Sequence, residues 1–207
     1  MLYCWLVVKS RFIYRFLKLN FGLAIYGAGL GMMVHAGIGI PPWDVLAQGL
    51  SLQTSLSFGQ ATIAVSLIVM LFWIPLRVRP GIGSVLNAIL VGLFADITMP
   101  LLPDFDLYWQ NVLLFIGGLL VISFATGLYI SCGFGKGPRD GLMMGLAQKF
   151  NQPFWITRTS AEIIVVSIGF LLGGQVREGT LIFALSIGYL NQLAMRLFGL
   201  ADKSGRV

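Results

Sequence analysis

Two short stretches of the chain carry residues that could bind a solute inside a membrane. Asp44 and Asp140 each follow a glycine-rich loop and a proline, and each precedes a run of mostly apolar residues. An Asp at such a place is typical of a helix N-cap, where its carboxylate accepts hydrogen bonds from free backbone N–H groups. At membrane depth the same carboxylate could instead serve a substrate or a gate. Both interpretations stay open.

The two stretches are copies of one another. The sequence of residues 37–51 returns 96 positions later, without a gap, as residues 133–147, and seven of the 15 positions are identical. Composition alone would give about one or two identities in such a window. The chain therefore contains an internal repeat.

The residue before the Asp is aromatic in one copy and positively charged in the other. Arg139 and Trp43 occupy equivalent positions. If an internal two-fold axis relates the copies, Arg139 lies beside Asp44 and Trp43 lies beside Asp140. A buried carboxylate would then be paired with a guanidinium, as charges inside a membrane usually are.

Glycines and prolines build the loops before the two Asp residues. Glycine adopts positive φ and lets helices approach closely, while proline fixes the entry into the next helix and has no N–H that needs a partner. These properties suit non-helical backbone at membrane depth, which survives only where it is buried in protein or lines a wet cavity. The loop residues are Gly37, Gly39, Pro42, Gly133, Gly135, Gly137 and Pro138.

Four further residues are candidates by position. His35 ends the first apolar segment, where it could relay protons or bond a backbone carbonyl. Asp96 lies about two-thirds along the third apolar segment and is either functional or a hydrated carboxylate near the outer interface. Arg158 and Glu162 stand four residues apart, so we expect them to form a structural ion pair on one face of a helix.

These residues belong to a chain that is too hydrophobic for a soluble domain. Of its 207 residues, 57% are apolar and 11% are charged, and the mean hydropathy is +0.86, whereas about a quarter of the residues of an average soluble protein are charged. The net charge of +6 comes from basic residues that flank apolar segments, which indicates positive-inside anchoring. We expect a lipid bilayer as the environment, no nucleic-acid partner, and no metal or cofactor, because neither cysteine belongs to a ligand motif.

Six apolar segments are long enough to cross the bilayer. About 20 helical residues span a hydrocarbon core of about 30 Å. Two segments between them, Asp44 to Gln53 and Asp140 to Lys149, would extend only about 15 Å as helices, so we expect them to be re-entrant. The expected crossings are Leu19 to Val34, Gly59 to Leu76, Gly83 to Leu102, Asn111 to Cys132, Thr159 to Gly173 and Thr180 to Phe198.

The charges favour one topology over another. If the short segments are re-entrant, each copy crosses three times and the copies are inverted, which puts thirteen of the fourteen Lys and Arg residues on the cytoplasmic side. Eight crossings would instead place several of these cations outside, against the positive-inside rule. The predicted fold is an all-α integral membrane protein with six transmembrane helices and two re-entrant half-helices, arranged as two inverted repeats of three crossings. Both termini would be cytoplasmic, in a bacterial inner membrane.

The same pattern divides the chain into five parts. They are a basic interfacial N-terminal segment (1–18), membrane repeat 1 (19–102), an external loop (103–110), membrane repeat 2 (111–198) and a cytoplasmic tail (199–207).

Several motifs resemble those of one family. They are residues 43–50 followed by Ser57-Phe58-Gly59, the turn at 79–83, the stretch 137–143 and the stretch 179–185, and they are similar to the YczE group of the YczE/YyaS/YitT family of small bacterial integral membrane proteins. The resemblance covers residues 19–195. It implies an inner-membrane protein of a kind often discussed as a transporter and, in some members, associated with lipopeptide production. It implies neither a substrate nor a catalytic residue.

The architecture favours one function and leaves another open. Inverted repeats with paired half-helices are typical of secondary transporters and channels. We therefore expect a small-solute secondary transporter or channel with a central site where the two half-helix N-termini meet. The alternative is a non-transporting membrane partner or scaffold for biosynthetic machinery such as lipopeptide production. An enzyme is not expected, because the chain has no H-E-x-x-H or G-x-S-x-G motif, and self-association stays open.

Overall fold

The chain is helical throughout the part that the structure describes. This computed structural model describes the backbone of residues 2–200 and the side chains of residues 12–200, and no strand occurs among them. Six helices are long and apolar enough to cross a membrane, which confirms the prediction of a multi-pass all-helical protein. They are Phe12–Ala36, Phe58–Leu76, Ile82–Leu101, Tyr108–Ile130, Phe154–Leu171 and Glu178–Leu197.

Two shorter helices lie between these spans, as the sequence predicts. They are α2 (Pro42–Gln53) and α7 (Pro138–Phe150), of 12 and 13 residues. The remaining elements are α1 (Leu2–Ala36), α3 (Phe58–Leu71), α4 (Trp73–Leu76), α5 (Ile82–Thr98), the 3-10 turn η1 (Met99–Leu101), α6 (Tyr108–Ile130), α8 (Phe154–Leu171) and α9 (Glu178–Leu197).

Two expected boundaries differ from the structure. Helix α1 runs through residue 18 without a break, so the basic N-terminal lead is continuous with the first span. Helix α8 begins at Phe154, five residues before the expected Thr159, because Pro153 can precede a helix without leaving an N–H unsatisfied. The position of the lead on the inner leaflet stays a prediction, and residues 201–207 of the expected tail lie outside the described part.

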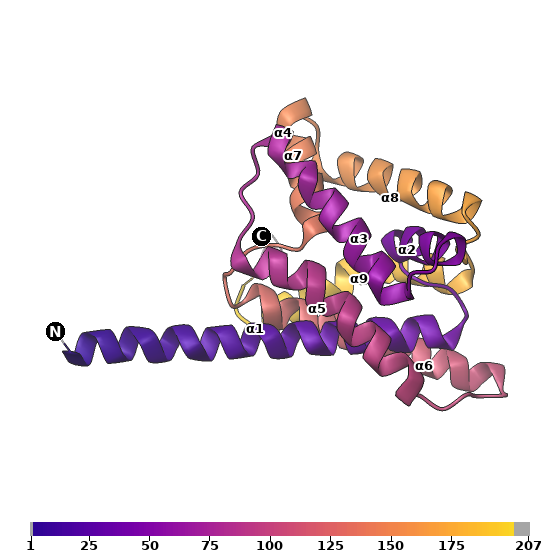
Figure 1. Cartoon of the computed structure of the whole chain (residues 1–207), viewed down its shortest axis with the longest axis horizontal. Coiled ribbons are helices and arrows are strands. Elements are labelled where there is room, and N and C mark those ends of the chain that lie inside the picture. The colour runs from indigo at the N-terminus through magenta and orange to yellow at the C-terminus, as the bar shows by residue number, and fades with distance from the viewer. Residues whose placement is uncertain (1, 201–207) are drawn as a thin grey trace.

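The helices form two layers (Figure 1). Helix α1 packs between α5 and α6, and α9 packs on α6; these four helices are the lower layer. Helices α2, α3, α4, α7 and α8 pack on one another above it and form the upper layer.

Glycines allow the close helix contacts inside the lower layer. A Cβ at Gly27 would come within 2.6 Å of the Val91 carbonyl of α5, and a Cβ at Gly29 would come within 2.9 Å of the Gly118 carbonyl of α6. In a membrane, where there is no hydrophobic drive between helices, such small residues let backbones approach and gain van der Waals contact. The glycines of α1 thus allow both α5 and α6 to pack closely against it.

In the upper layer, each short helix packs on a long helix of the other sequence copy. Helix α2 lies on α8, and α7 lies on α3 and α4. The contact positions are equivalent: a Cβ at Gly49 would come within 2.8 Å of Leu172, and a Cβ at Gly145 would come within 3.1 Å of Leu76, 96 residues before Leu172. The Trp73 indole also donates to the Pro138 carbonyl at 3.0 Å and so ties α4 to the start of α7.

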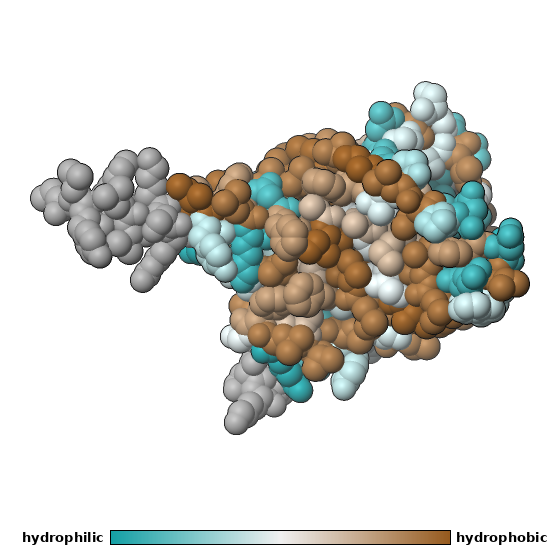
Figure 2. All heavy atoms as spheres, turned by 90° about the horizontal axis from the view of Figure 1, so that it is seen from below, coloured by the Kyte–Doolittle hydropathy of each residue, from teal (hydrophilic) through white to brown (hydrophobic). Residues whose placement is uncertain are grey.

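The surface is that of an integral membrane protein. Figure 2 shows hydrophobic atoms over the middle of the face seen there, with hydrophilic atoms gathered towards its two ends. Large apolar side chains stay exposed along the spans, among them Leu171 at 83% and Leu185 at 84%. A lipid environment accounts for such exposure, since lipid tails cover it at no cost.

One cation fixes the lower layer to the loop before α7. Arg15 of α1 donates from Nε to the Cys132 carbonyl at 2.9 Å. Cys132 is a buried free thiol, and burial raises its pKa above the usual value. The second cysteine, Cys4, has a side chain outside the described part.

Candidate functional site

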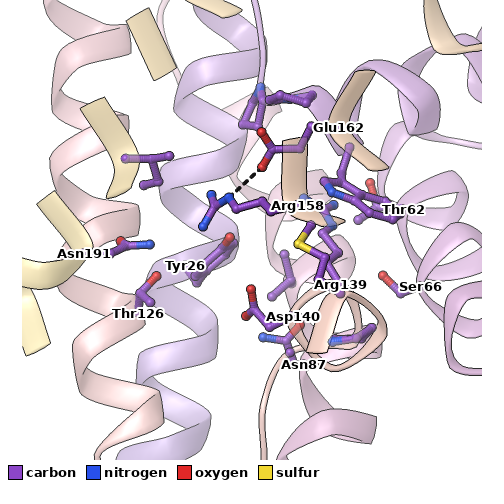
Figure 3. Close-up of a pocket in the computed structure, with 18 of the residues that line it drawn as sticks. Tyr26, Thr62, Ser66, Asn87, Thr126, Arg139, Asp140, Arg158, Glu162 and Asn191 are labelled. Atoms are coloured by element: carbon purple, nitrogen blue, oxygen red, sulfur yellow. Dashed lines mark hydrogen bonds and ion pairs between the residues drawn. The ribbon is translucent and has the colours of Figure 1, made fainter. Parts of the chain in front are cut away.

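A small polar cavity lies between the two layers, where α2 and α7 begin. Its volume is about 90 Å³, and because an ordered water needs about 10–15 Å³ of such space, several waters fit. Figure 3 shows that its side chains converge from helices of both layers. Such a wet space is what non-helical backbone at membrane depth requires.

An ion pair between the two sequence copies stands at this cavity. Arg139, at the start of α7, donates two hydrogen bonds to the Asp44 carboxylate of α2, one of them from Nη1 at 2.9 Å and the other from Nη2. The Asp44 side chain is only 2% exposed, and that of Arg139 is 21% exposed and lines the cavity. The pairing expected from the equivalence of Arg139 and Trp43 is confirmed.

Neither Asp44 nor Asp140 is an N-cap, so the capping interpretation, one of the two that the sequence left open, is wrong. The N-caps of α2 and α7 are Pro41 and Gly137, and neither helix has a side-chain cap hydrogen bond. Each helix begins at the proline that follows its cap, because proline at the first position has its φ preset and lacks an N–H that would be unsatisfied. Both Asp residues are therefore third in their helices, where a carboxylate still favours the positive end of the helix dipole.

Asp140 faces the cavity without a partner. Among the described residues it makes no hydrogen bond and no ion pair, and its carboxylate points into the space that Figure 3 shows. Its expected neighbour Trp43 also lines the cavity, but the Trp43 indole does not donate to it; the ring lies 6.0 Å from the Arg139 guanidinium carbon.

Two more polar atoms of the wall are unpartnered in the described part of the chain. They are the indole Nε1 of Trp43, whose residue is 6% exposed, and the amide Oδ1 of Asn191. An unpaired buried polar group costs about 1–3 kcal/mol. A donor and an acceptor left unpaired in one cavity indicate that water or a ligand completes them.

Arg158 and Glu162 form the expected pair and also line the cavity. Arg158 Nε donates to Glu162 Oε1 at 2.9 Å, across one turn of α8. The dashed line in Figure 3 marks this contact. The side chains are 33% and 22% exposed, so the pair is only partly buried where it borders the cavity.

Asp96 and His35 lie away from the cavity. Asp96 of α5 accepts from the Gly59 backbone N–H at 2.7 Å and from the Ser57 hydroxyl, so it binds the N-terminus of α3. His35 Nε2 lies 3.1 Å from the Pro103 carbonyl and 3.4 Å from the exposed Asp104 carboxylate. Neither residue shares the central space with the ion pair, although the sequence grouped them as candidates.

The repeated loops match in backbone conformation. Gly37 and Gly133 have φ of 64° and 67°, and Gly39 and Gly135 have φ of 127° and 124°. Positive φ favours glycine at all four positions. Gly137 was expected to share this property, but its φ is −61° because it is the N-cap of α7.

Each loop accepts a hydrogen bond from the start of the last long helix of the other copy, α5 or α9. The Gly83 N–H donates to the Phe134 carbonyl at 2.9 Å, and the Gly179 N–H donates to the Ile38 carbonyl at 2.9 Å. The two donors are 96 positions apart, and so are the two acceptors. The bonds are therefore reciprocal between the copies.

Equivalent positions also line the cavity. Seven pairs of its wall residues are separated by 96 positions, for example Thr62 with Arg158 and Ser66 with Glu162. The analysis of the sequence missed most of this wall, although polar residues within apolar spans are a usable signal. The missed polar residues are Tyr26, Thr62, Ser66, Asn87, Thr126, Tyr129 and Asn191.

Comparison with known proteins agrees with this architecture. An uncharacterized protein of Haemophilus influenzae is 42% identical over 179 residues, which cover 86% of this chain and 82% of the relative. The uncharacterized membrane protein YczE of Bacillus subtilis is 28% identical over 190 residues (91% and 88% of the two chains), and YyaS of the same organism is 23% identical over 186 residues (87% and 92%). No solved structure matches the chain.

The aligned residues cover nearly all of the helical bundle. The relatives include YczE and YyaS, which belong to the family that the sequence motifs resemble. A family model, described as a family of unknown function (DUF6198), matches residues 13–196, which include both repeated loops and every span except Phe12 and Leu197. The chain belongs to the DUF6198 family, a family of unknown function, and is homologous to YczE and YyaS.

Proposed function

We propose that the chain is a small-solute secondary transporter of the bacterial inner membrane, with the cavity between the layers as its substrate site. The observation that carries this proposal is the origin of the cavity wall. Seven pairs of equivalent positions from the two sequence copies meet there. A binding site on the axis between two repeats is where secondary transporters hold their substrates.

In this proposal α2 and α7 are re-entrant and the repeats are inverted. At about 1.5 Å per residue, helices of 12 and 13 residues reach only about 18–20 Å, short of a hydrocarbon core of about 30 Å. Each copy then crosses three times, and an odd number reverses the second copy. The reciprocal bonds of Gly83 and Gly179 support a two-fold relation between the copies.

The proposed orientation places both termini in the cytoplasm. Figure 1 has both ends of the described chain on the same side of the layers, as an even number of crossings requires. Arg77 and Arg79 lie between α3 and α5, on the side of the N-terminus, while Asp104 and Asp106 follow α5 on the other side. The positive-inside rule supports this assignment.

The charges around the cavity favour a solute that brings positive charge. Arg139 is neutralised by Asp44, and Arg158 by Glu162. Asp140 is left as one carboxylate in excess. A substrate amine or a coupling proton would neutralise it, and the unpaired Trp43 N–H would hold an acceptor on the same solute.

A non-transporting membrane partner is the second candidate. It is favoured by α8, whose spanning window is only 11% buried, compared with 56% for α6. An apolar flank of that extent could hold a helix of another membrane protein. This candidate function predicts no solute movement in purified form.

Uptake into proteoliposomes tests the proposal. The probes are radiolabelled primary amines, amino acids and short carboxylic acids, with protein-free liposomes as the blank. We expect saturable uptake of at least one amine-bearing class, and a reduction of about tenfold or more in Asp140→Asn, because that variant removes the charged acceptor. Asp106→Asn, an exposed loop carboxylate that does not line the cavity, is the control and should transport as the wild type does. Uptake no greater than the blank for every class, or equal loss in both variants, would contradict the proposal.

A further inference from the structure

The two layers touch each other unequally. Inside each layer, contacts follow the equivalence of the copies: α1 packs on α5 as α6 packs on α9, and α2 packs on α3 as α7 packs on α8. Between the layers the equivalence fails. Helix α3 packs closely on α5, whereas α8 and α9, their counterparts, do not pack closely and diverge from the turn that joins them (Figure 1).

The α3–α5 contact is closed at the backbone and held by a carboxylate. A Cβ at Gly92 would come within 2.9 Å of the Ile63 side chain and closer still to the Gly59 carbonyl. Asp96, one turn further along α5, accepts from the Gly59 N–H at 2.7 Å and from the Ser57 hydroxyl. Hydrogen bonds to a carboxylate are stronger than those between neutral groups. We call Asp96 with Ser57 and Gly59 the latch.

The equivalent place on α9 is open. Gly188, the counterpart of Gly92, has no atom within 4 Å of an added Cβ, and its neighbour Ile187 lines the cavity. On the facing helix, the cavity-lining Arg158 is still 33% exposed. On one side of the cavity α8 and α9 are therefore loosely packed, and on the other side α3 and α5 are tightly packed.

We propose that the latch is the gate on the side of the Asp104 loop, and that the gap between α8 and α9 is the entrance on the side of the termini. This inference deepens the proposed function, on which it rests. The upper layer would rock on the lower layer, so that α8 closes on α9 at Gly188 while α3 leaves α5 at Gly92. Since the contacts inside each layer follow a two-fold relation, the two end states would exchange the packing of the α3–α5 pair with that of the α8–α9 pair.

The proposal gives Gly92 and Gly188 opposite roles. A side chain at Gly188 fits the present state but would prevent α8 from closing on α9. A side chain at Gly92 cannot fit the present state and would hold α3 away from α5. Loss of the Asp96 carboxylate would loosen the same gate without adding volume, whereas Asn retains an acceptor for the Gly59 N–H.

Labelling of one cavity cysteine tests this directly. The full chain carries Ser66→Cys in a background with Cys4→Ser and Cys132→Ser, and membrane vesicles of both orientations receive an impermeant cationic methanethiosulfonate. We expect labelling from the side of the termini to exceed labelling from the other side by about tenfold or more. Gly188→Leu should keep that bias. Asp96→Ala and Gly92→Ala should each raise labelling from the Asp104 side by about tenfold, and Asp96→Asn should restore most of the bias.

Every outcome bears on the gate separately from transport. Equal labelling from both sides, labelling only from the Asp104 side, or none from either side would overturn the proposal. So would an Asp96→Ala variant that labels as its parent does, or a Gly188→Leu variant that opens the Asp104 side. Since the reagent needs no substrate, a correct gate with no uptake would refute the proposed function alone, and uptake without the expected sidedness would refute the gate alone.

Discussion

The pair between Arg139 and Asp44 is an ion pair between the two sequence copies. It joins the starts of α2 and α7 through two hydrogen bonds, and Asp44 is almost fully buried. Removing water from two charges is costly, so such a pair is tolerated only with good geometry on both sides. Each residue of the pair thus depends on the other.

Breaking this pair should destabilise the protein more than breaking the pair on α8. Asp44→Asn leaves a buried guanidinium without its counter-charge, and we expect a loss of about 3–5 kcal/mol in the free energy of unfolding. Glu162→Gln, in the more exposed i,i+4 pair, should cost about 0.3–0.5 kcal/mol. Unfolding in detergent, followed by circular dichroism, measures both.

A charge-free pair at the same place is the matched comparison. Asp44→Leu combined with Arg139→Met should recover most of the stability that Asp44→Asn loses, because no unpaired charge remains. If Asp44→Asn and Glu162→Gln lose equal stability, the buried pair does not hold the two half-helices together.

Also at the scale of residues, the sequence predicted the Arg139–Asp44 pair but not the other residues of the cavity. The equivalence of Trp43 and Arg139 was enough to place Arg139 beside Asp44. It could not show that Asp140 would stay unpaired, because a side chain's freedom depends on every neighbour and not on its counterpart alone. The wall residues of the cavity were also not predicted. A Ser or Thr in an apolar span can form a hydrogen bond within its own helix, as Thr62 does with the Phe58 carbonyl, so its presence does not by itself indicate a site.

At the scale of elements, the lengths of the helices and the breaks between them could be predicted from the sequence, because the thickness of the bilayer determines how many apolar residues a span needs. The apolar runs predicted all six spans and both short helices. The starts of the short helices were misplaced by two residues, since a proline and an Asp both mark a helix N-terminus and the proline decided it. A Pro at the first helical position therefore outweighs an Asp two residues later.

Helix α2 packs so closely on α8 that a side chain at the contact should destabilise the protein. An added Cβ at Gly169 of α8 would lie 2.5 Å from the Leu46 nitrogen and 2.6 Å from the Val45 carbonyl carbon of α2. Backbone atoms cannot rotate away, so Gly169→Ala should destabilise the protein by about 1–3 kcal/mol.

The control for that change is a glycine in open space. Gly188→Ala meets nothing within 4 Å, and Gly→Ala in a helix gains about 1 kcal/mol in propensity, so its stability should be equal to or above the wild type. Equal destabilisation by the two changes, measured by thermal unfolding in detergent, would show that α2 does not rest on α8 as described.

At the scale of the whole molecule, the repeat explains the layers but not their unequal contact. Two equal copies predict two equal flanks, and the repeat alone does not show which of two equivalent states a molecule occupies. The close α3–α5 contact and the open Gly188 flank are therefore features that only the structure could supply. They are also what a molecule that alternates between two states would present.

The direction of the two copies is the claim on which the site, the gate and the orientation all depend. It is tested by single cysteines at Arg79 and Asp104, both exposed, in the background with Cys4→Ser and Cys132→Ser. An impermeant maleimide is applied to vesicles of known orientation that carry a tag at the N-terminus. Inverted repeats predict that Arg79→Cys is labelled on the side of the tag and Asp104→Cys on the opposite side. Arg79→Cys labelled opposite the tag, with Asp104→Cys on the same side as the tag, would mean that α2 crosses the bilayer completely and that the two copies run parallel.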